Sequence, residues 1–218
     1  MQKVLIISYF FEPCSFVGAE RTVYWAKNLH KHGFYPIILT RQWNKGQINF
    51  NDDVKHNKFE HIKNDEYEVY KMPYNKTIRD ILSRYKYLKI PQKILTFLES
   101  ILSNFFLKAL PFSNFYNQAD LILKVHPKTK FIINSVSPHQ SLFLSYKLKK
   151  KYPEILFIAD YRDEWTTRKT NYPTNFLERI IFNLNKSSEK RWTSNMDFFI
   201  TVSEKWKQSL SIFLNKKG

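Results

Sequence analysis

The chain has 218 residues, with 35 lysines and arginines against 19 aspartates and glutamates, which gives a formal net charge of +16. A hydrophobic content of 43% argues against disorder, and a single cysteine excludes a disulfide framework and a multi-cysteine metal site. The positive charge predicts attraction to an anionic partner, which leaves nucleic acid, a membrane surface and phosphorylated ligands open.

The charge is distributed unevenly: the net value is +2 over residues 1–75, +5 over 76–112 and +9 over 113–218, so it is not a basic tail. No secretory signal follows the first methionine, and no uncharged apolar run approaches the roughly 18–20 residues that span a bilayer. We therefore expect a cytoplasmic protein, with peripheral binding at the inner face of the cell membrane as one option.

Strand-like and helix-like segments alternate along most of the chain. The predicted strands cover residues 4–9, 36–40, 68–72, 130–134, 155–160 and 198–202. The predicted helices cover residues 19–32, 138–151, about 176–193 and 203–214. Gly33 is expected just after the first helix and Ser203 as the N-cap of the last one. The polar residues 41–66 predict a surface loop or a poorly ordered excursion.

Residues 76–118 differ in kind, since they are rich in Ile, Leu, Phe, Tyr and Lys and contain no glycine. They predict two or three helices, because Ile94, Leu98 and Ile101 recur at helical spacing. Basic, aromatic amphipathic helices lie in the interface of anionic membranes, whereas the alternative is a helix that packs on the domain and solvates its lysines. The candidate membrane-facing residues are Arg84, Lys86, Lys89, Lys93, Phe105 and Phe106.

The alternation predicts an α/β fold: a doubly wound, mostly parallel Rossmann-like sheet with helices on both faces, plus a basic helical insertion at about 76–118. Ligands of such sheets bind at the carboxyl ends of the strands. The informative loops are therefore those after Tyr9, Asn134 and Asp160.

The first of these loops ends in Gly18, Ala19, Glu20 and Arg21 at a predicted helix start. Backbone amides and the helix dipole make such a start a natural anion site. The sequence has neither a GxGxxG motif nor a P-loop lysine, so an ordinary strand-to-helix turn is the alternative.

The second loop places Pro138 at the expected first helical position, with Ser137 as the cap. His139 would then lie in the first turn, where it could donate to a substrate oxygen or act as a base. An exposed, solvated histidine is the alternative.

The third loop, residues 160–165, reads DYRDEW and follows a buried strand directly. Aspartate–arginine pairing holds such a loop rigid, and aromatic faces suit the apolar C–H surface of a sugar. A purely structural pair between Arg162 and a carboxylate is the alternative.

These loops resemble the N-terminal domain of family 4-like glycosyltransferases of the GT-B type. The matching segments are FEPCSFVGAER at 11–21, SPH at 137–139, DYRDEW at 160–165, and Glu189 and Asp197 followed by ITVSE at 200–204. Their order and spacing agree over nearly the whole chain. The chain departs from the family pattern at Val17, where a glycine is usual, and at His139, where a second proline is usual.

The resemblance implies that residues 1–218 are one acceptor-binding domain and that the C-terminal donor-binding domain is absent. The intact enzyme would be a retaining glycosyltransferase of cell-surface polysaccharide synthesis. It would transfer a sugar from a nucleotide sugar, its co-substrate, to a glycan or lipid-linked acceptor, without metal or cofactor. The donor domain is expected in cis or in trans, and the chain alone is expected to be inactive.

The resemblance also assigns roles to the loop residues. His139 and Asp163 are the expected catalytic residues. The expected substrate-binding residues are Gly18, Ala19, Arg21, Ser137, Arg162 and Trp165. Two other classes stay open: a basic nucleic-acid-binding domain, disfavoured because no recognition motif is present, and a non-catalytic partner subunit.

Overall fold

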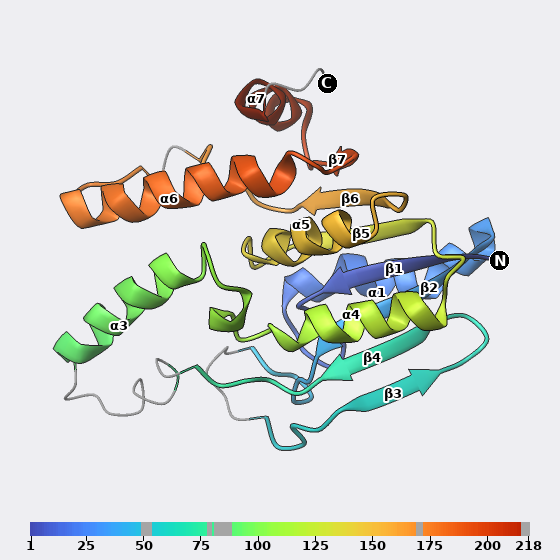
Figure 1. The fold of residues 1–218 in the computed structure, drawn as a ribbon. Coiled ribbons are helices and arrows are strands. Elements are labelled where there is room, and N and C mark those ends of the chain that lie inside the picture. The colour runs from blue at the N-terminus through green and yellow to red at the C-terminus, as the bar shows by residue number, and fades with distance from the viewer. Residues whose placement is uncertain (49–53, 78–79, 81–88, 169–171, 215–218) are drawn as a thin grey trace.

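A computed structural model describes residues 1–48, 54–77, 80, 89–168 and 172–214 of this chain. These residues form a seven-stranded sheet in the order β3-β4-β2-β1-β5-β6-β7 (Figure 1). The strands are β1 (Gln2–Ser8), β2 (Phe34–Arg41), β3 (Glu60–Lys63), β4 (Glu68–Met72), β5 (Phe131–Val136), β6 (Leu156–Tyr161) and β7 (Phe198–Ile200). The helices are α1 (Val17–Asn28), α3 (Lys89–Leu102), α4 (Asn114–Val125), α5 (Ser141–Lys151), α6 (Phe176–Thr193) and α7 (Glu204–Leu214), with short 3₁₀ segments η1 (Leu29–His32) and η2 (Leu107–Ala109).

The sheet is parallel except for the edge pair β3–β4. Strand β1 lies at its centre, where Ile6 pairs in register with Ile38 of β2 and Ile133 of β5. The strand order reverses between β1 and β5, which makes this the switch point where open α/β sheets bind ligands. The predicted α/β fold with a mostly parallel Rossmann-like sheet is confirmed.

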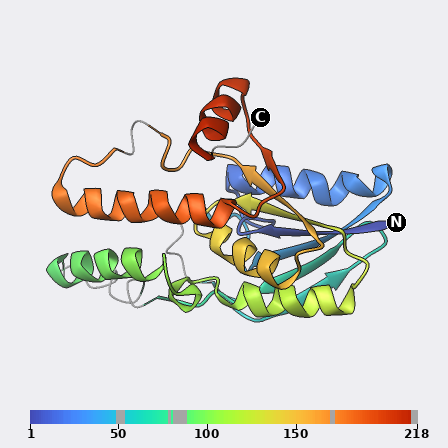
Figure 2. The ribbon, with the colours of Figure 1, turned by 45° about the horizontal axis from the view of Figure 1, so that its top comes forward.

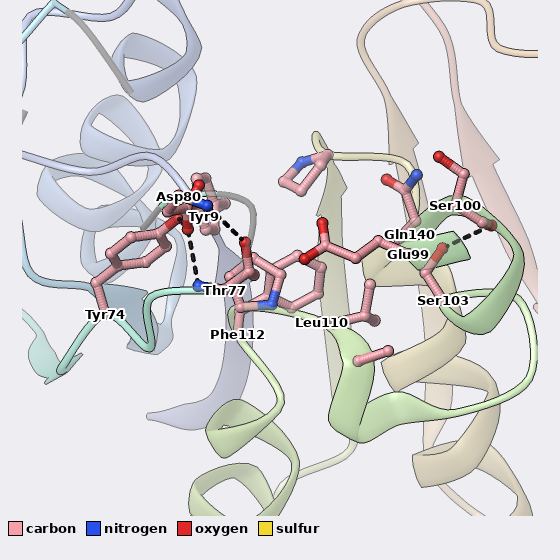
Figure 3. Close-up of a pocket in the computed structure, with 13 residues that line it drawn as sticks. Tyr9, Tyr74, Thr77, Asp80, Glu99, Ser100, Ser103, Leu110, Phe112 and Gln140 are labelled. Carbon is pink, nitrogen blue, oxygen red and sulfur yellow. Dashed lines mark hydrogen bonds between the residues drawn. The ribbon is translucent and has the colours of Figure 1, made fainter. Parts of the chain in front are cut away.

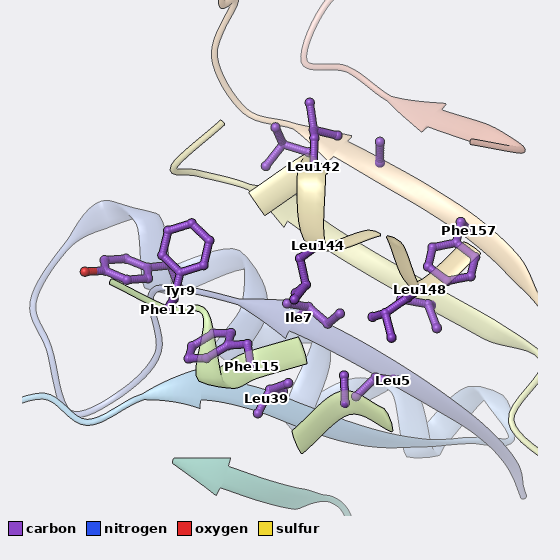
Figure 4. Close-up of a cluster of buried hydrophobic side chains, with 14 of the residues drawn as sticks. Leu5, Ile7, Tyr9, Leu39, Phe112, Phe115, Leu142, Leu144, Leu148 and Phe157 are labelled. Carbon is purple, nitrogen blue, oxygen red and sulfur yellow. The ribbon is translucent and has the colours of Figure 1, made fainter. Parts of the chain in front are cut away.

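Helices cover both faces of the sheet, with α1 on one face and α4 and α5 on the other (Figure 2). The continuous apolar run of β1 explains this, because alternate side chains of a strand point to opposite faces. Val4 and Ile6 belong to the cluster that includes Ala26 of α1. Leu5 and Ile7 join the larger cluster, to which α4 and α5 contribute Phe115 and Leu144 (Figure 4). Each such buried side chain contributes about 1.5–3 kcal/mol.

Two predicted helix ends are confirmed. Gly33 follows η1 in the left-handed conformation at φ 81°, which glycine adopts without a steric penalty. The Ser203 hydroxyl oxygen accepts a hydrogen bond from the Trp206 amide at 3.3 Å, as expected of the N-cap of α7.

The prediction for the start of α5 was wrong. The helix begins at Ser141, and Pro138 and His139 lie in a turn before it. This turn is closed by short-range bonds from the Ser141 amide to the Pro138 carbonyl and from the Leu142 amide to the His139 carbonyl. Pro138 is thus not the first helical residue, Ser137 is not the cap, and His139 is not in the first helical turn.

The reading of residues 41–66 as a surface loop was also wrong in part. Arg41, Gln42 and Trp43 are buried at the end of β2. Residues 60–63 form β3, which pairs antiparallel with β4 at the sheet edge. All four residues of β3 are exposed, so the strand lacks the apolar alternation by which a half-buried strand is recognised.

The predicted insertion contains α3 and η2, whereas α4 begins inside its predicted range and belongs to the layer over the sheet. Helices α3 and α6 lie side by side and project beyond the sheet (Figures 1 and 2). Asn104 links them, since its side chain donates to Asn185 at 3.1 Å and its carbonyl accepts from Arg191 at 2.7 Å. None of the helices within the described ranges is long and apolar enough to cross a membrane.

Candidate functional site

A hollow of about 530 Å³ lies where the loops after β1, β5 and β6 meet, and we call it the switch-point hollow. The sequence predicted five of its lining residues from three separate segments. The complete lining consists of Phe10, Phe16, Val17, Gly18, Arg21, Ser137, Arg162, Asp163 and Val202. The structure thus brings Gly18, Arg21, Ser137, Arg162 and Asp163 together.

An ion pair between Arg21 of α1 and Asp160 of β6 fixes one wall of the switch-point hollow. The Asp160 side chain is fully buried, and burial raises the pKa of its carboxyl group, while the Arg21 guanidinium opposes that rise. A buried carboxylate requires such a partner, so Arg21 joins the start of α1 to the end of β6.

Arg162 fastens the loop after β6 to the same helix start. Its guanidinium donates to the carbonyl of Gly18 and, at 3.1 Å, to the carbonyl of Val17. Burial lowers the pKa of Arg162, and the neighbouring positive charge of Arg21 lowers it further. Because Asp160 and Asp163 balance these two cations, the hollow suits a neutral ligand rich in hydroxyl groups better than a polyanion.

Gly18 has a packing reason to be glycine. A Cβ atom at this position would lie 2.9 Å from Cδ2 of Phe10 and 3.4 Å from a guanidinium nitrogen of Arg162. The Phe10 ring has little room to move, because it stacks on Trp43 with ring centroids 5.5 Å apart. Any side chain at Gly18 would therefore displace the lining of the hollow.

His139 and Trp165 lie behind the switch-point hollow and do not line it. Their rings stack at 5.2 Å, and Trp165 in turn stacks on Trp192 at 6.0 Å. His139 Nε2 donates to the Asp163 carbonyl at 3.2 Å. Burial lowers the pKa of His139, which favours a neutral imidazole at pH 7. Ala19, another predicted site residue, is buried and does not line the hollow either.

The structure adds a buried carboxylate that the sequence pointed to only through the family resemblance. Glu189 of α6 accepts hydrogen bonds from the Tyr161 hydroxyl at 3.0 Å and from both the amide and the hydroxyl of Thr166. Burial raises the pKa of Glu189, and these donors oppose the rise. Glu189 therefore holds the loop that carries Arg162 and Asp163 against α6. Its helix neighbours Ser188 and Trp192 are buried too. The sequence alone gives only a weak indication that this side of α6 is buried.

A second hollow, of about 280 Å³, lies between α3 and the ends of β1 and β5, and we call it the α3 hollow (Figure 3). Aromatic rings, hydroxyl groups and two carboxylates are part of its lining, and such groups suit a sugar. The lining consists of Tyr9, Tyr74, Thr77, Asp80, Glu99, Ser100, Ser103, Ala109, Leu110, Pro111, Phe112, Pro138 and Gln140. The turn before α5 separates the two hollows, because Ser137 lines one and Gln140 lines the other. The sequence missed the α3 hollow because most of its lining residues belong to α3 and to the segments just before and after it, and no rule for strand ends predicts how these pack against the sheet.

The structure describes four of the six residues that were predicted to face a membrane. Phe105 and Phe106, which follow α3, are 50% and 60% exposed. Lys89 and Lys93 lie on α3. Arg84 and Lys86 lie outside the described residues.

No protein-family model matches this chain, and no curated protein matches it either. Over the described ranges, no group of three or more histidine, cysteine, aspartate or glutamate side chains could hold a metal ion.

Proposed function

We propose that this chain is the acceptor-side domain of a retaining GT-B glycosyltransferase. One observation carries the proposal: three of the motif-bearing segments, which lie far apart in the sequence, meet in one hollow at the switch point of the sheet. The balanced charges and the neighbouring α3 hollow support a sugar-bearing acceptor, because aromatic rings and hydroxyl groups bind sugars.

In this proposal the sugar leaves its nucleotide diphosphate and joins a hydroxyl group of a glycan or lipid-linked acceptor. The bond from the anomeric carbon to the diphosphate oxygen breaks, a bond to the acceptor oxygen forms, and the hydroxyl proton is released. The exposed carboxylate of Asp163 is the group of this chain that accepts a hydrogen bond from the acceptor. His139 positions Asp163 through its carbonyl. The nucleotide sugar is held by a donor domain in cis or in trans.

The α3–α6 projection supports docking on the inner face of an anionic membrane. Phe105 and Phe106 are exposed near the carboxyl end of α6, where Phe105 lies by Arg191, and Phe176 is 74% exposed at the other end of that helix. Exposed Arg179 and Lys186 accompany them on α6. Exposed aromatic side chains next to cations suit the interface of a membrane with anionic lipids.

A transfer assay tests the proposed reaction. Labelled nucleotide sugars and a panel of glycan and lipid-linked acceptors are incubated with the chain and a donor domain, joined or separate. We expect transfer that Asp163→Ala reduces by at least tenfold, about 1.4 kcal/mol in the barrier. Asp65→Ala, an exposed carboxylate in the β3–β4 turn, leaves it unchanged. Equal rates in the two variants would contradict the role of Asp163.

Binding measured against salt concentration separates the membrane from the nucleic-acid alternative. The 218-residue chain is titrated with anionic vesicles and with duplex DNA. We expect the chain to bind anionic vesicles. The double variant Phe105→Ser/Phe106→Ser should bind them more weakly. Tight DNA binding with a steep salt dependence, together with no vesicle binding, would replace the proposal by a nucleic-acid-binding function.

A further inference from the structure

A third hollow, of about 580 Å³, opens at the carboxyl end of β2, and we call it the basic hollow. Among its lining residues that the structure describes, four are lysines, one is a histidine and one is a glutamate. The lining consists of Pro13, Gln42, Trp43, Asn44, Lys45, Lys55, His56, Lys58, Phe59, Glu60 and Lys71. None of the proposed transferase residues is among them.

Side-chain hydrogen bonds hold the two walls of the basic hollow together. The Asn44 side-chain oxygen accepts from the Lys55 amide at 2.9 Å. The Gln42 amide group donates to the Lys58 carbonyl at 2.9 Å. Segment 54–60 is thereby fixed against the end of β2, so the lysines surround a built cavity.

The one carboxylate of the lining is already paired. Glu60 lies 3.2 Å from the Lys71 ammonium group and accepts from Gln42 at 3.2 Å. Lys45, Lys55 and Lys58 form no ion pair with any carboxylate in the described part of the chain. Within the described residues, the hollow therefore presents three lysines that no carboxylate pairs.

A buried guanidinium adds to the potential of this hollow. Arg41 is 1% exposed, and its Nη2 has no hydrogen-bond partner among the described residues. The guanidinium lies 3.8 Å from the ring centroid of Trp43, whose indole lines the hollow. It also donates to the Gln42 carbonyl at 3.1 Å and to the Tyr9 hydroxyl at 2.6 Å, and it lies over the Tyr74 ring, whose hydroxyl donates to the Asp80 carboxylate. Arg41 forms no direct ion pair within the described residues, and a buried guanidinium of this kind raises the local potential because little water screens it.

Overall composition does not explain this concentration of charge. Residues 1–75, which supply the whole basic hollow, have a net charge of only +2, whereas the rest of the chain carries the remaining excess. The fold therefore gathers cations here from the least basic part of the sequence.

We propose that the basic hollow binds a phosphate or diphosphate group. Lysine ammonium groups act as point charges toward phosphate oxygens, and the volume lies within the range of small-ligand sites. Two kinds of molecule carry such a group: a phosphorylated lipid, in its headgroup, and a soluble phosphorylated compound. The proposal does not depend on the transferase function, because the two hollows share no residue.

Calorimetric titration of the 218-residue chain with inorganic pyrophosphate tests the proposal. The variant is Lys45→Gln/Lys55→Gln/Lys58→Gln, and the charge-matched control is Lys31→Gln/Lys128→Gln/Lys205→Gln, which removes three exposed lysines elsewhere. We expect saturable binding that weakens about tenfold in the variant and less than twofold in the control. No binding by the wild type, or equal weakening in variant and control, would overturn the proposal.

Vesicles distinguish the two sources of the phosphate. Phosphatidic acid vesicles are compared with phosphatidylcholine vesicles, using the same variant and control. Loss of both pyrophosphate and phosphatidic acid binding in the variant identifies a lipid headgroup. Loss of pyrophosphate binding alone identifies a soluble phosphorylated ligand. Loss of vesicle binding with pyrophosphate binding intact would overturn the proposal, because the lysines would then act only as general surface charge.

Discussion

The switch-point hollow and the basic hollow both lie at the carboxyl ends of the parallel strands, yet their charged side chains are arranged in opposite ways. In the first, Arg21 is paired with a buried carboxylate and Arg162 is bonded to backbone carbonyls. In the second, Lys45, Lys55 and Lys58 line the cavity without a carboxylate partner among the described residues. The same end of the sheet thus has one hollow in which positive charges are paired and another in which they gather without a partner among the described residues.

The difference separates two kinds of recognition. Charges that are paired and hydrogen-bonded hold loops in place, so under the proposed function the switch-point hollow would discriminate by shape and by hydroxyl contacts. Exposed cations attract anions over distance, and salt screens that attraction, since the Debye length is about 8 Å at physiological ionic strength. Binding at the basic hollow should therefore fall steeply with salt, and binding at the switch-point hollow should change little.

The largest expected effect comes from Glu189, which supports the loop of the switch-point hollow. Glu189→Ala leaves the buried Tyr161 hydroxyl and Thr166 amide without their acceptor. We expect the free energy of unfolding to fall by about 3 kcal/mol, measured by urea denaturation. The control is Glu204→Ala at an exposed position of α7, which should change the free energy of unfolding by less than about 0.5 kcal/mol. A loss below 1 kcal/mol for Glu189→Ala would show that this support is dispensable.

A second effect is expected at Gly18. Gly18→Ala places a methyl group against Phe10 and the Arg162 guanidinium. We expect a loss of about 1–3 kcal/mol from overpacking, read from the same denaturation curves, with Val17→Ala as the exposed neighbouring control. A neutral Gly18→Ala would mean that Phe10 has room to move and that the wall of the hollow is soft.

A smaller effect is expected from pH. Burial lowers the folded-state pKa of His139 and of His126, with the positive charge of Lys3 also lowering that of His126. The unfolded chain therefore binds more protons than the folded chain once the pH drops toward about 6.5 and below, and stability falls between about pH 7 and 5.

The same unfolding experiment, repeated across this pH range, measures that loss. His139→Gln should make the decline shallower, with His126 supplying the remainder, and His32→Gln, at an exposed position, should leave it unchanged. An identical decline in His139→Gln and in the wild type would contradict the burial of this imidazole.

The smallest effect on folding is expected at the basic hollow. The triple lysine-to-glutamine variant removes exposed charges with no ion pair in the described structure, so the free energy of unfolding should change by less than about 1 kcal/mol. Thermal unfolding in low and high salt checks this. A large destabilisation would show that these lysines stabilise the fold. That result would contradict the view that they are exposed charges without a carboxylate partner.

The sequence predicted the parts of the molecule that follow from periodicity. Continuous apolar runs such as that of β1 predicted the strands. The rule that parallel sheets bind ligands at the carboxyl ends of their strands predicted that Gly18, Ser137 and Arg162 are neighbours. Local rules failed where tertiary contacts decide. Edge strand β3 has no apolar side, and the turn at Pro138 precedes α5 instead of starting it.

The basic hollow was missed for a related reason. Arg41 and Trp43 sit in a polar stretch, and nothing in their local sequence indicates that a guanidinium would be buried between aromatic rings. Lys55 and Lys58 reach the end of β2 only because Asn44 and Gln42 bind their backbone. Such side-chain pairing across a loop leaves no periodic trace in the sequence.

In the proposed function, the switch-point hollow binds the sugar of an acceptor. The most direct measurement is an NMR titration of the labelled chain with neutral oligosaccharides at low and high salt. The account predicts saturable shifts of the amide signals of Gly18, Ser137 and Asp163 that are nearly the same at both salt concentrations. Shifts confined to the basic hollow, or no saturable shift with any oligosaccharide, would contradict it.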